Sequence, residues 1–170
     1  MKYSWPVSNT HENDISSPYG ERISPITGVN EFHKGVDIAA PKKTPVLAIS
    51  DCLIAYVSSE PDEFMGNFLV YETLDGIRVN YFHLHSFAKK ISSSNLVKKG
   101  EIVGYVGKSG ATTGNHLHFQ VARKWQVAGE SFDPMELFTE DNPLVAINAL
   151  LDDILYKTNE LRELISRIRG

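Results

Sequence analysis

The sequence predicts a mainly β protein, in which a compact antiparallel β-sheet domain is followed by a C-terminal α-helix. Two observations support this prediction. From Pro45 to about Val121, short apolar runs follow one another and are separated by turn residues, as is typical of strands. After Asp133-Pro134 the apolar residues recur at alternating steps of three and four, as is typical of a helix.

Strands are expected throughout the central part of the chain. Residues 1–30 precede them and are rich in Ser, Pro, Asn and Gly, so we expect an N-terminal arm over 1–16 and the domain proper over 17–140. Leu74-Asp75-Gly76 favours a hairpin, because Asp-Gly tolerates the positive φ of a type I′ turn. The expected strands are 46–57, 68–73, 77–87, 102–106 and 117–121.

A C-terminal helix is expected over 142–170, with Asn142-Pro143 as an N-cap followed by proline at the first helical position. Its apolar seam has heptad spacing and comprises Leu144, Ile147, Leu151, Ile154, Thr158, Leu161, Ile165 and Ile168. Leucine at a and isoleucine at d favour trimers or tetramers, so we expect a homo-oligomeric coiled coil, trimer favoured, through residues 144–168. The alternative is a helix packed on its own β domain, because Leu150, Leu155 and Leu164 widen the apolar stripe.

Composition excludes several classes of protein. The 170 residues fit one domain of ordinary size with an appendage, and the formal net charge of −4 gives no basic field for nucleic acid. Cys52 is the only cysteine, so neither an internal disulfide nor a cysteine-rich zinc site is expected. Residues 1–6 lack the apolar stretch of a signal peptide, and no run of ~18 apolar residues predicts a membrane span.

Five of the six histidines lie in three short runs in which polar and apolar residues alternate. Because successive strand side chains point to opposite faces, His116 and His118 are expected on one face and the apolar residues between and after them on the other. His33 and Asp37 share a face by the same argument. His83 and His85 form the third run, and we expect them opposite Phe82 and Leu84.

These side chains suggest a metal site. Two imidazoles and one carboxylate are the ligand set of a catalytic zinc with an open coordination position, and His33, Asp37 and one of the later histidines supply such a set. We therefore expect one Zn²⁺ per chain. Non-haem Fe(II) oxygenases use a similar set, and metal analysis distinguishes the two classes.

The motifs that carry these residues resemble the ordered signature of lysostaphin-type (LytM-like) zinc metallopeptidases. They are residues 33–41, 81–84, 104–107 and 114–119, with a lead-in at 19–22, and the match spans about 17–138. The resemblance implies a compact antiparallel sheet with the metal in a groove. It implies zinc ligation by His33, Asp37 and His118, catalytic roles for His83 and His116, and cleavage of peptide bonds in bacterial peptidoglycan.

Some of these residues have two possible roles. The resemblance does not divide the catalytic roles between His83 and His116, and His85 shares the predicted face of His83. His11, with Asn9 and Asn13, could be an incidental arm residue or could reach the open zinc position as a latency latch. Arg22 could bind a substrate carboxylate or form a structural ion pair.

The chain departs from the usual pattern of this family in its loops. Lys42-Lys43 replaces a common Pro-x-Gly turn, Cys52 stands where Gly is usual, and Asn115 stands where Pro is common. None of these changes removes an expected ligand. Because loops around a groove set substrate preference, the bond that is cut is not predicted.

The leading functional hypothesis is a zinc endopeptidase that acts at the bacterial cell wall. The alternative is a latent or non-catalytic module that binds peptidoglycan and is assembled through its coiled coil. The absence of a signal sequence together with a trimer-favouring helix suggests a virion-associated lysin at a phage tail tip, although a fragment of a secreted protein fits too.

Overall fold

The computed structural model describes residues 2–92, 95–123 and 130–139, together with residues 150, 151, 154, 157, 158, 161, 162 and 165–167. The chain divides into two compact units, Met1–Phe138 and Thr139–Gly170. The first unit contains these elements: 3₁₀ turns η1 (Glu12–Asp14) and η2 (Pro134–Leu137), and strands β1 (Ile15–Ser17), β2 (Gly20–Ile23), β3 (Asn30–His33), β4 (Val36–Ala39), β5 (Pro45–Leu47), β6 (Cys52–Val57), β7 (Asn67–Thr73), β8 (Ile77–Phe87), β9 (Leu96–Val97), β10 (Ile102–Val106) and β11 (His116–Arg123).

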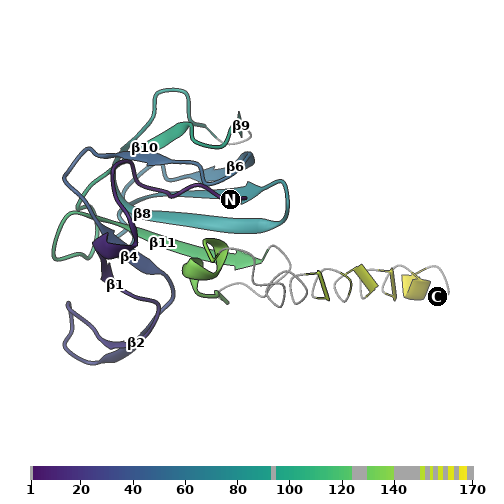
Figure 1. The fold of residues 1–170 in the computed structure, drawn as a ribbon, viewed down its shortest axis with the longest axis horizontal. Helices are drawn as coiled ribbons and strands as arrows, with labels where there is room; N and C mark the ends of the chain where they lie inside the picture. Colours follow the sequence, from purple (N-terminus) through teal and green to yellow (C-terminus); the bar gives the residue numbers. More distant parts are fainter. Residues whose placement is uncertain are drawn as a thin grey trace. The chain divides into compact units, whose positions relative to one another are not determined.

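An antiparallel sheet of nine strands dominates the first unit and confirms the predicted fold class. Seven strands follow the order β1-β4-β11-β8-β7-β6-β9, and β10 joins the sheet by pairing with β5 and β8. β2 and β3 form a separate hairpin that extends away from the main sheet (Figure 1). The long central strands β8 and β11 pair over six residues, which places the middle of the chain beside its later part.

One face of the sheet carries the hydrophobic core, as the alternating sequence pattern predicts. Tyr81 and Phe119 are register partners on β8 and β11, and both side chains are fully buried. The hydroxyl of Tyr71 donates to that of Tyr81 (2.9 Å), which donates in turn to the carbonyl of Leu47 (2.8 Å). The polar ends of these buried rings are therefore satisfied, and a buried polar group costs stability only when it lacks such partners.

The N-terminal residues belong to the first unit. Tyr3 and Val7 are buried in its core, and Val7 forms a bridge with Val46. The Leu47 amide donates to the Pro6 carbonyl (2.8 Å), so the expected arm lies along β5. The residues expected to form the arm thus make contacts within the first unit.

The second unit contains the residues of the expected coiled coil, of which Leu144, Ile147 and Ile168 lie outside the described part. The residues of this unit that are described between 150 and 167 are each helical, but they are isolated single positions or short runs. The Thr158 hydroxyl donates to the Ile154 carbonyl (2.7 Å). These positions do not establish a substantial continuous helix, so the predicted helix over 142–170 and its coiled coil are not supported. Within the described residues, no helix combines the length and the apolar character needed to cross a membrane.

Candidate metal centre and active site

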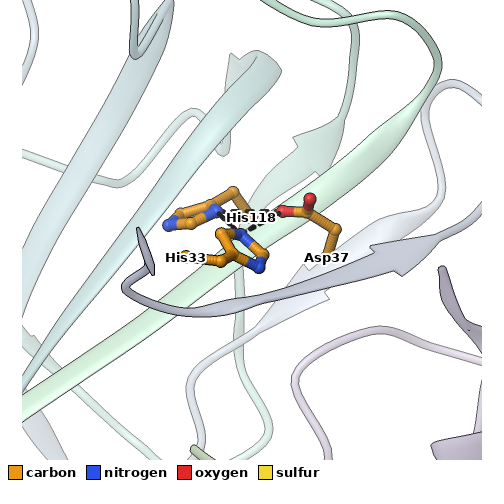
Figure 2. A group of neighbouring side chains, drawn as sticks. All are labelled: His33, Asp37 and His118. Atoms are coloured by element: carbon orange, nitrogen blue, oxygen red, sulfur yellow. Dashed lines mark hydrogen bonds and ion pairs between the residues drawn. The ribbon is translucent and has the colours of Figure 1, made fainter. Parts of the chain in front are cut away.

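Three side chains from three different strands converge on one point of the first unit. His33 is the last residue of β3, Asp37 lies on β4, and His118 lies on β11 directly opposite Asp37 in the strand register. The His33 Nε2 atom lies 3.0 Å from His118 Nδ1 and 3.2 Å from Asp37 Oδ1, and His118 Nδ1 lies 2.9 Å from the same oxygen. Figure 2 shows the three donor atoms directed toward one another.

This donor set fits a divalent metal ion. All three residues are buried, and each offers one ligand atom within 4.8 Å of the others. Two imidazole nitrogens and one carboxylate oxygen at ~2.0–2.2 Å from a tetrahedral ion would lie roughly 3.4 Å apart, so the donors need to separate by only a few tenths of an ångström. The fourth position of such an ion would remain available for water or substrate.

A backbone carbonyl orients the first of these imidazoles. His33 Nδ1 lies 2.7 Å from the carbonyl oxygen of Pro18, to which it donates, and this contact leaves the lone pair of Nε2 directed at the donor set. Hydrogen bonds of this kind fix the tautomer and ring direction of metal-binding histidines. The Pro18 carbonyl was not identified from the sequence, because a backbone group gives no residue-type signal.

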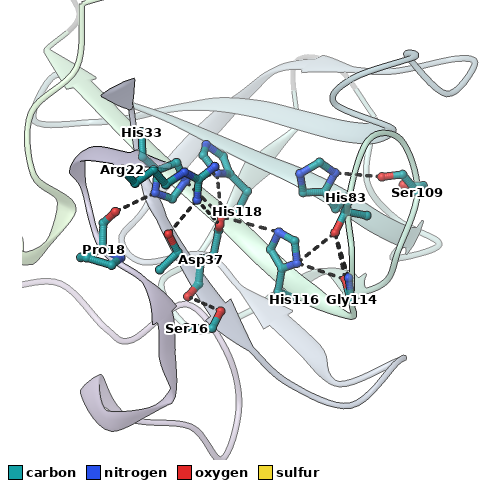
Figure 3. A network of polar contacts seen from close by, with 12 residues as sticks. Ser16, Pro18, Arg22, His33, Asp37, His83, Ser109, Gly114, His116 and His118 are labelled. Atoms are coloured by element: carbon teal, nitrogen blue, oxygen red, sulfur yellow. Dashed lines mark hydrogen bonds and ion pairs between the residues drawn. The ribbon is translucent and has the colours of Figure 1, made fainter. Parts of the chain in front are cut away.

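Asp37 is held as a carboxylate. Burial raises its pKa, but the contacts of the carboxylate with His118 and His33 outweigh burial and hold the pKa well below the usual range. Arg22 Nη1 lies 3.0 Å from Asp37 Oδ2 and 2.7 Å from the Ser17 hydroxyl, while its Nε donates to Glu31 (2.8 Å). Of the two roles left open for Arg22, the structure shows the ion pair, which occupies the oxygen that faces away from the histidines (Figure 3).

His116 and His83 lie beside the metal-binding group, with ring centroids 4.9 Å apart. His116 Nε2 lies 3.5 Å from Asp37 Oδ1, and its Nδ1 faces the Gly114 carbonyl (3.1 Å). His83 Nδ1 faces the Ser109 carbonyl (2.8 Å). Both rings therefore use Nδ1 to contact the backbone (Figure 3), and in the neutral imidazole this leaves Nε2 as a proton acceptor.

Burial keeps both of these imidazoles neutral near pH 7. Desolvation lowers the pKa of His83 to about 4, although its hydrogen bond to Ser109 acts in the opposite direction. Burial also lowers the pKa of His116, against the raising effect of Asp37. A neutral, enclosed imidazole with a free Nε2 can accept a proton, which is the property required of a general base.

The conformation of His83 differs from the sequence expectation. Its φ is +63°, a left-handed value that is uncommon for a residue with a Cβ, and its amide donates to the Met65 carbonyl (2.9 Å) outside the strand pairing. This irregularity interrupts the alternation of β8. Phe82 therefore lies on the same side as His83, with its ring stacked on His118 at a centroid distance of 5.1 Å. The expectation that Phe82 faces away from His83 was wrong because it assumed a regular strand.

The remaining histidines lie apart from this group. Leu84 is buried in the core, whereas His85 is half-buried, and within the described residues no ring contact joins His85 to the four clustered histidines. The backbone of His85 packs closely against Gly107, where an added Cβ would collide with the His85 nitrogen. His11 is exposed and lines a different hollow, together with Trp5 and Phe138. The described contacts thus give no support to a latch formed by His11.

A single hollow is lined by two members of the metal-binding group, Asp37 and His118, and by the two adjacent histidines. Its walls come from β1, the β2–β3 hairpin and the loop before β11. Thr112 in that loop lies 3.2 Å from His116 Nδ1 and was not identified from the sequence, because a loop threonine carries no periodic signal. The lining residues include Ser16, Ser17, Arg22, Ile26, Asp37, His83, Thr112, His116 and His118.

The first unit is a mainly β domain that holds a buried His-Asp-His group beside two neutral histidines. This combination is typical of one class of protein, the metallopeptidases of the lysostaphin type. Residues 31–134 match the model of peptidase family M23, and the chain belongs to this family. The match confirms the resemblance drawn from the sequence motifs.

Relatives with assigned names include the DD-carboxypeptidase/endopeptidase Mpg of Neisseria meningitidis, 33% identical over 123 residues, which cover 72% of this chain and 26% of Mpg. The peptidoglycan DD-endopeptidase ShyB of Vibrio cholerae is 33% identical over 117 residues, 69% of this chain and 26% of ShyB. The chain thus spans about a quarter of the length of these relatives.

Similarity to solved structures supports the same family assignment. A zinc-containing peptidase from Vibrio cholerae has a TM-score of 0.66 and 30% identity, with 79% of this chain and 40% of that chain covered. The catalytic domain of lysostaphin from Staphylococcus simulans has a TM-score of 0.65 and 30% identity, with 75% of this chain and 95% of that chain covered. The second comparison matches nearly a whole catalytic domain to three quarters of this chain.

Proposed function

We propose that this chain is a zinc-dependent endopeptidase that hydrolyses peptide bonds in the cross-links or stem peptides of bacterial peptidoglycan. The observation that carries the proposal is the single hollow lined by Asp37 and His118, which form a donor group with His33, and by the two neutral imidazoles of His83 and His116. Membership of peptidase family M23 and the names of Mpg and ShyB support the substrate class.

His33, Asp37 and His118 would hold one Zn²⁺ per chain. When bound, this ion would supply a Lewis acid that polarises a scissile carbonyl and lowers the pKa of water toward ~7. Arg22 would keep the Asp37 carboxylate in place through the oxygen that the histidines do not use. The enclosure of these groups strengthens each electrostatic contact among them, because the effective dielectric constant is lower than in bulk water.

His83 and His116 would move the protons of the reaction. Because both direct Nδ1 at a backbone carbonyl, each can accept a proton at Nε2 and then becomes a donor at the same atom. One of the two would take the proton of the attacking water and return it to the leaving amine, and the other would donate a hydrogen bond to the carbonyl oxygen on which charge develops.

The test uses purified peptidoglycans of different cross-link chemistry and identifies the products by mass spectrometry. We expect new amino termini with the zinc-loaded protein and none after chelation. His83→Ala and His116→Ala should each lose cleavage while retaining stoichiometric zinc, and His118→Ala should lose both. His85→Ala is the matched control and should cleave normally.

Different outcomes would contradict different parts of this proposal. Zinc-dependent cleavage by the His118 variant would refute the ligand assignment. Stoichiometric zinc without cleavage of any peptidoglycan would refute the peptidase and favour the alternative, a latent module that binds the wall. A pH profile of each single histidine variant that retains residual cleavage separates the base from the hydrogen-bond donor, because only the base sets the acidic limb.

We also propose that three chains associate through residues 144–168, which would suit display at a phage tail tip or another site of action at the cell wall. Four described seam residues, Leu151, Ile154, Leu161 and Ile165, are 46–59% exposed within the chain, and burying them against other copies would remove apolar surface from water. Light scattering at micromolar concentration should give the mass of a trimer. A monomer would contradict the assembly.

A further inference from the structure

A row of aromatic side chains runs across the sheet away from the metal centre, and we call Tyr56, Phe68 and Phe82 the aromatic row. Phe82 stacks on His118 with ring planes 8° apart and a centroid distance of 5.1 Å. Phe68 meets Phe82 edge to face at 6.0 Å, and Tyr56 stacks on Phe68 at 5.3 Å. The four rings come from β11, β8, β7 and β6, which are successive neighbours in the sheet, so the row crosses the strands.

The aromatic row lies on the face of the sheet opposite the core. Leu69 and Tyr81, which follow Phe68 and precede Phe82 in sequence, are fully buried in the core, whereas Phe68 and Phe82 are half-buried. Tyr56 retains 47% of its surface at the outer end. The row is therefore an accessible aromatic surface that is continuous with the metal centre through the Phe82–His118 stack.

Two amide side chains accompany the aromatic row. Asn80 and Gln120 are register partners on β8 and β11, each two residues from Phe82 and His118 and thus on the same face. Both are half-buried, and their side chains form no hydrogen bond with any residue in the described ranges. They offer donors and acceptors beside a flat apolar surface, which is the combination of groups found in specific small-molecule sites.

The charges nearby favour a neutral ligand. Arg78 also lies on β8, but its guanidinium is paired with Glu72 at 3.0 Å. A peptide carboxylate would need a cation to compensate its desolvation, and this cation already has a partner. A sugar ring needs none, since one face of a pyranose presents C–H groups to an aromatic ring while its edge presents hydroxyl and acetamido groups.

We propose that the aromatic row, with Asn80 and Gln120, binds an N-acetylhexosamine ring of the glycan strand whose stem peptide is cut at the metal centre. This inference rests on the proposed function. The three ring separations place Tyr56 within the reach of an extended peptide of about four to five residues, at ~3.3–3.6 Å per residue, from His118. A stem peptide can therefore place its scissile bond at the metal while its sugar contacts the row.

The kinetic test compares two soluble substrates with the same cross-linked peptide, one carrying its disaccharide and one without sugar. Tyr56→Ala should raise KM for the sugar-bearing substrate roughly three- to tenfold, with little change in kcat, and leave the sugar-free peptide unaffected. Phe64→Ala is the matched control, because Phe64 is an exposed aromatic residue outside the row. Equal effects of Tyr56→Ala on both substrates, or no effect on either, would overturn the proposal.

A binding test separates this inference from the proposed function. A β-1,4-linked N-acetylglucosamine tetramer is titrated into the metal-free protein, and the side-chain amide resonances of Asn80 and Gln120 are followed by NMR. We expect saturable shifts that weaken in Tyr56→Ala and persist in Phe64→Ala. Saturable shifts in a protein that cleaves no peptide would support the sugar site and refute the peptidase, whereas cleavage without shifts would refute the sugar site alone.

Discussion

The left-handed backbone of His83 leads to a prediction about stability that reverses the usual preference for alanine over glycine in a strand. Position 83 has φ = +63° in the middle of β8. Holding a residue with a Cβ in this region costs about 1–2 kcal/mol, and glycine avoids this cost. Glycine in turn lowers the free energy of unfolding by about 0.4–1 kcal/mol, because it gives the unfolded chain more conformational freedom. We therefore expect His83→Gly to be more stable than His83→Ala by about 0.5–1 kcal/mol.

The comparison isolates the backbone because both variants lose the same imidazole and the same hydrogen bond to Ser109. Ser86 provides the matched control on the same strand. It is exposed, pairs with Tyr105 and lies outside the positive-φ positions, so Ser86→Ala should be more stable than Ser86→Gly by roughly 0.5–1 kcal/mol.

Urea unfolding of the four variants in excess chelator measures these differences without a contribution from metal binding. Equal stability of His83→Gly and His83→Ala, or a more stable His83→Ala, would refute a backbone cost at position 83 if the Ser86 pair shows its expected order. Both variants at position 83 should lack peptidase activity, so a gain in stability and a loss of function would occur in the same molecule.

Three further perturbations have expected outcomes. Lys43→Gly should raise the thermal midpoint, corresponding to about 0.5–1 kcal/mol, because Lys43 is exposed with φ = +71°, and a left-handed value favours glycine. Gly35→Ala should weaken zinc binding roughly 10- to 100-fold in a chelator competition, since its Cβ would lie 2.9 Å from His118 Nε2; unchanged affinity would contradict the geometry. Burial raises the pKa of Asp75, but its contacts with Lys2, Thr73 and Tyr3 together lower it, so the stabilising effect of Asp75 is present above its ordinary pKa of 3.8 and is lost as the pH falls below it. Asp75→Asn should therefore be less stable at pH 7 and less sensitive to pH below about 4 in thermal unfolding, and parallel curves would argue against this role.

The fold class could be predicted because the sheet has one buried face, which imposes an alternating pattern on its strands. Where the pattern fails, the prediction fails for a local reason. The expected strand 46–57 is divided into β5 and β6, since the segment between them turns while burying both Ala48 and Ile49. A continuous apolar run does not distinguish a strand from such a buried turn.

The candidate site could be predicted as far as residue types reveal it. Histidines and a carboxylate in strand motifs give a strong signal, and the structure brings His33, Asp37 and His118 together as expected, although their role as ligands stays a proposal. The partners that orient them could not be predicted, because backbone carbonyls have no sequence signature. The stacking of Phe82 on His118 could not be predicted either, because it depends on the left-handed φ of His83. The alternation of side chains in a regular strand does not predict such a value.

The register between β4 and β11 sets the order of events during folding. Two of the three donors are four residues apart in the sequence, but the third, His118, is 81 residues from Asp37. The entropy cost of closing a loop of this length comes before the stabilising contacts between its ends. The metal centre therefore forms together with the long-range pairing of the sheet. A nascent chain that ends before His118 has only two of these donors. Tight metal binding, and any hydrolysis that depends on it, would therefore begin only once the chain has passed this strand and folded around it.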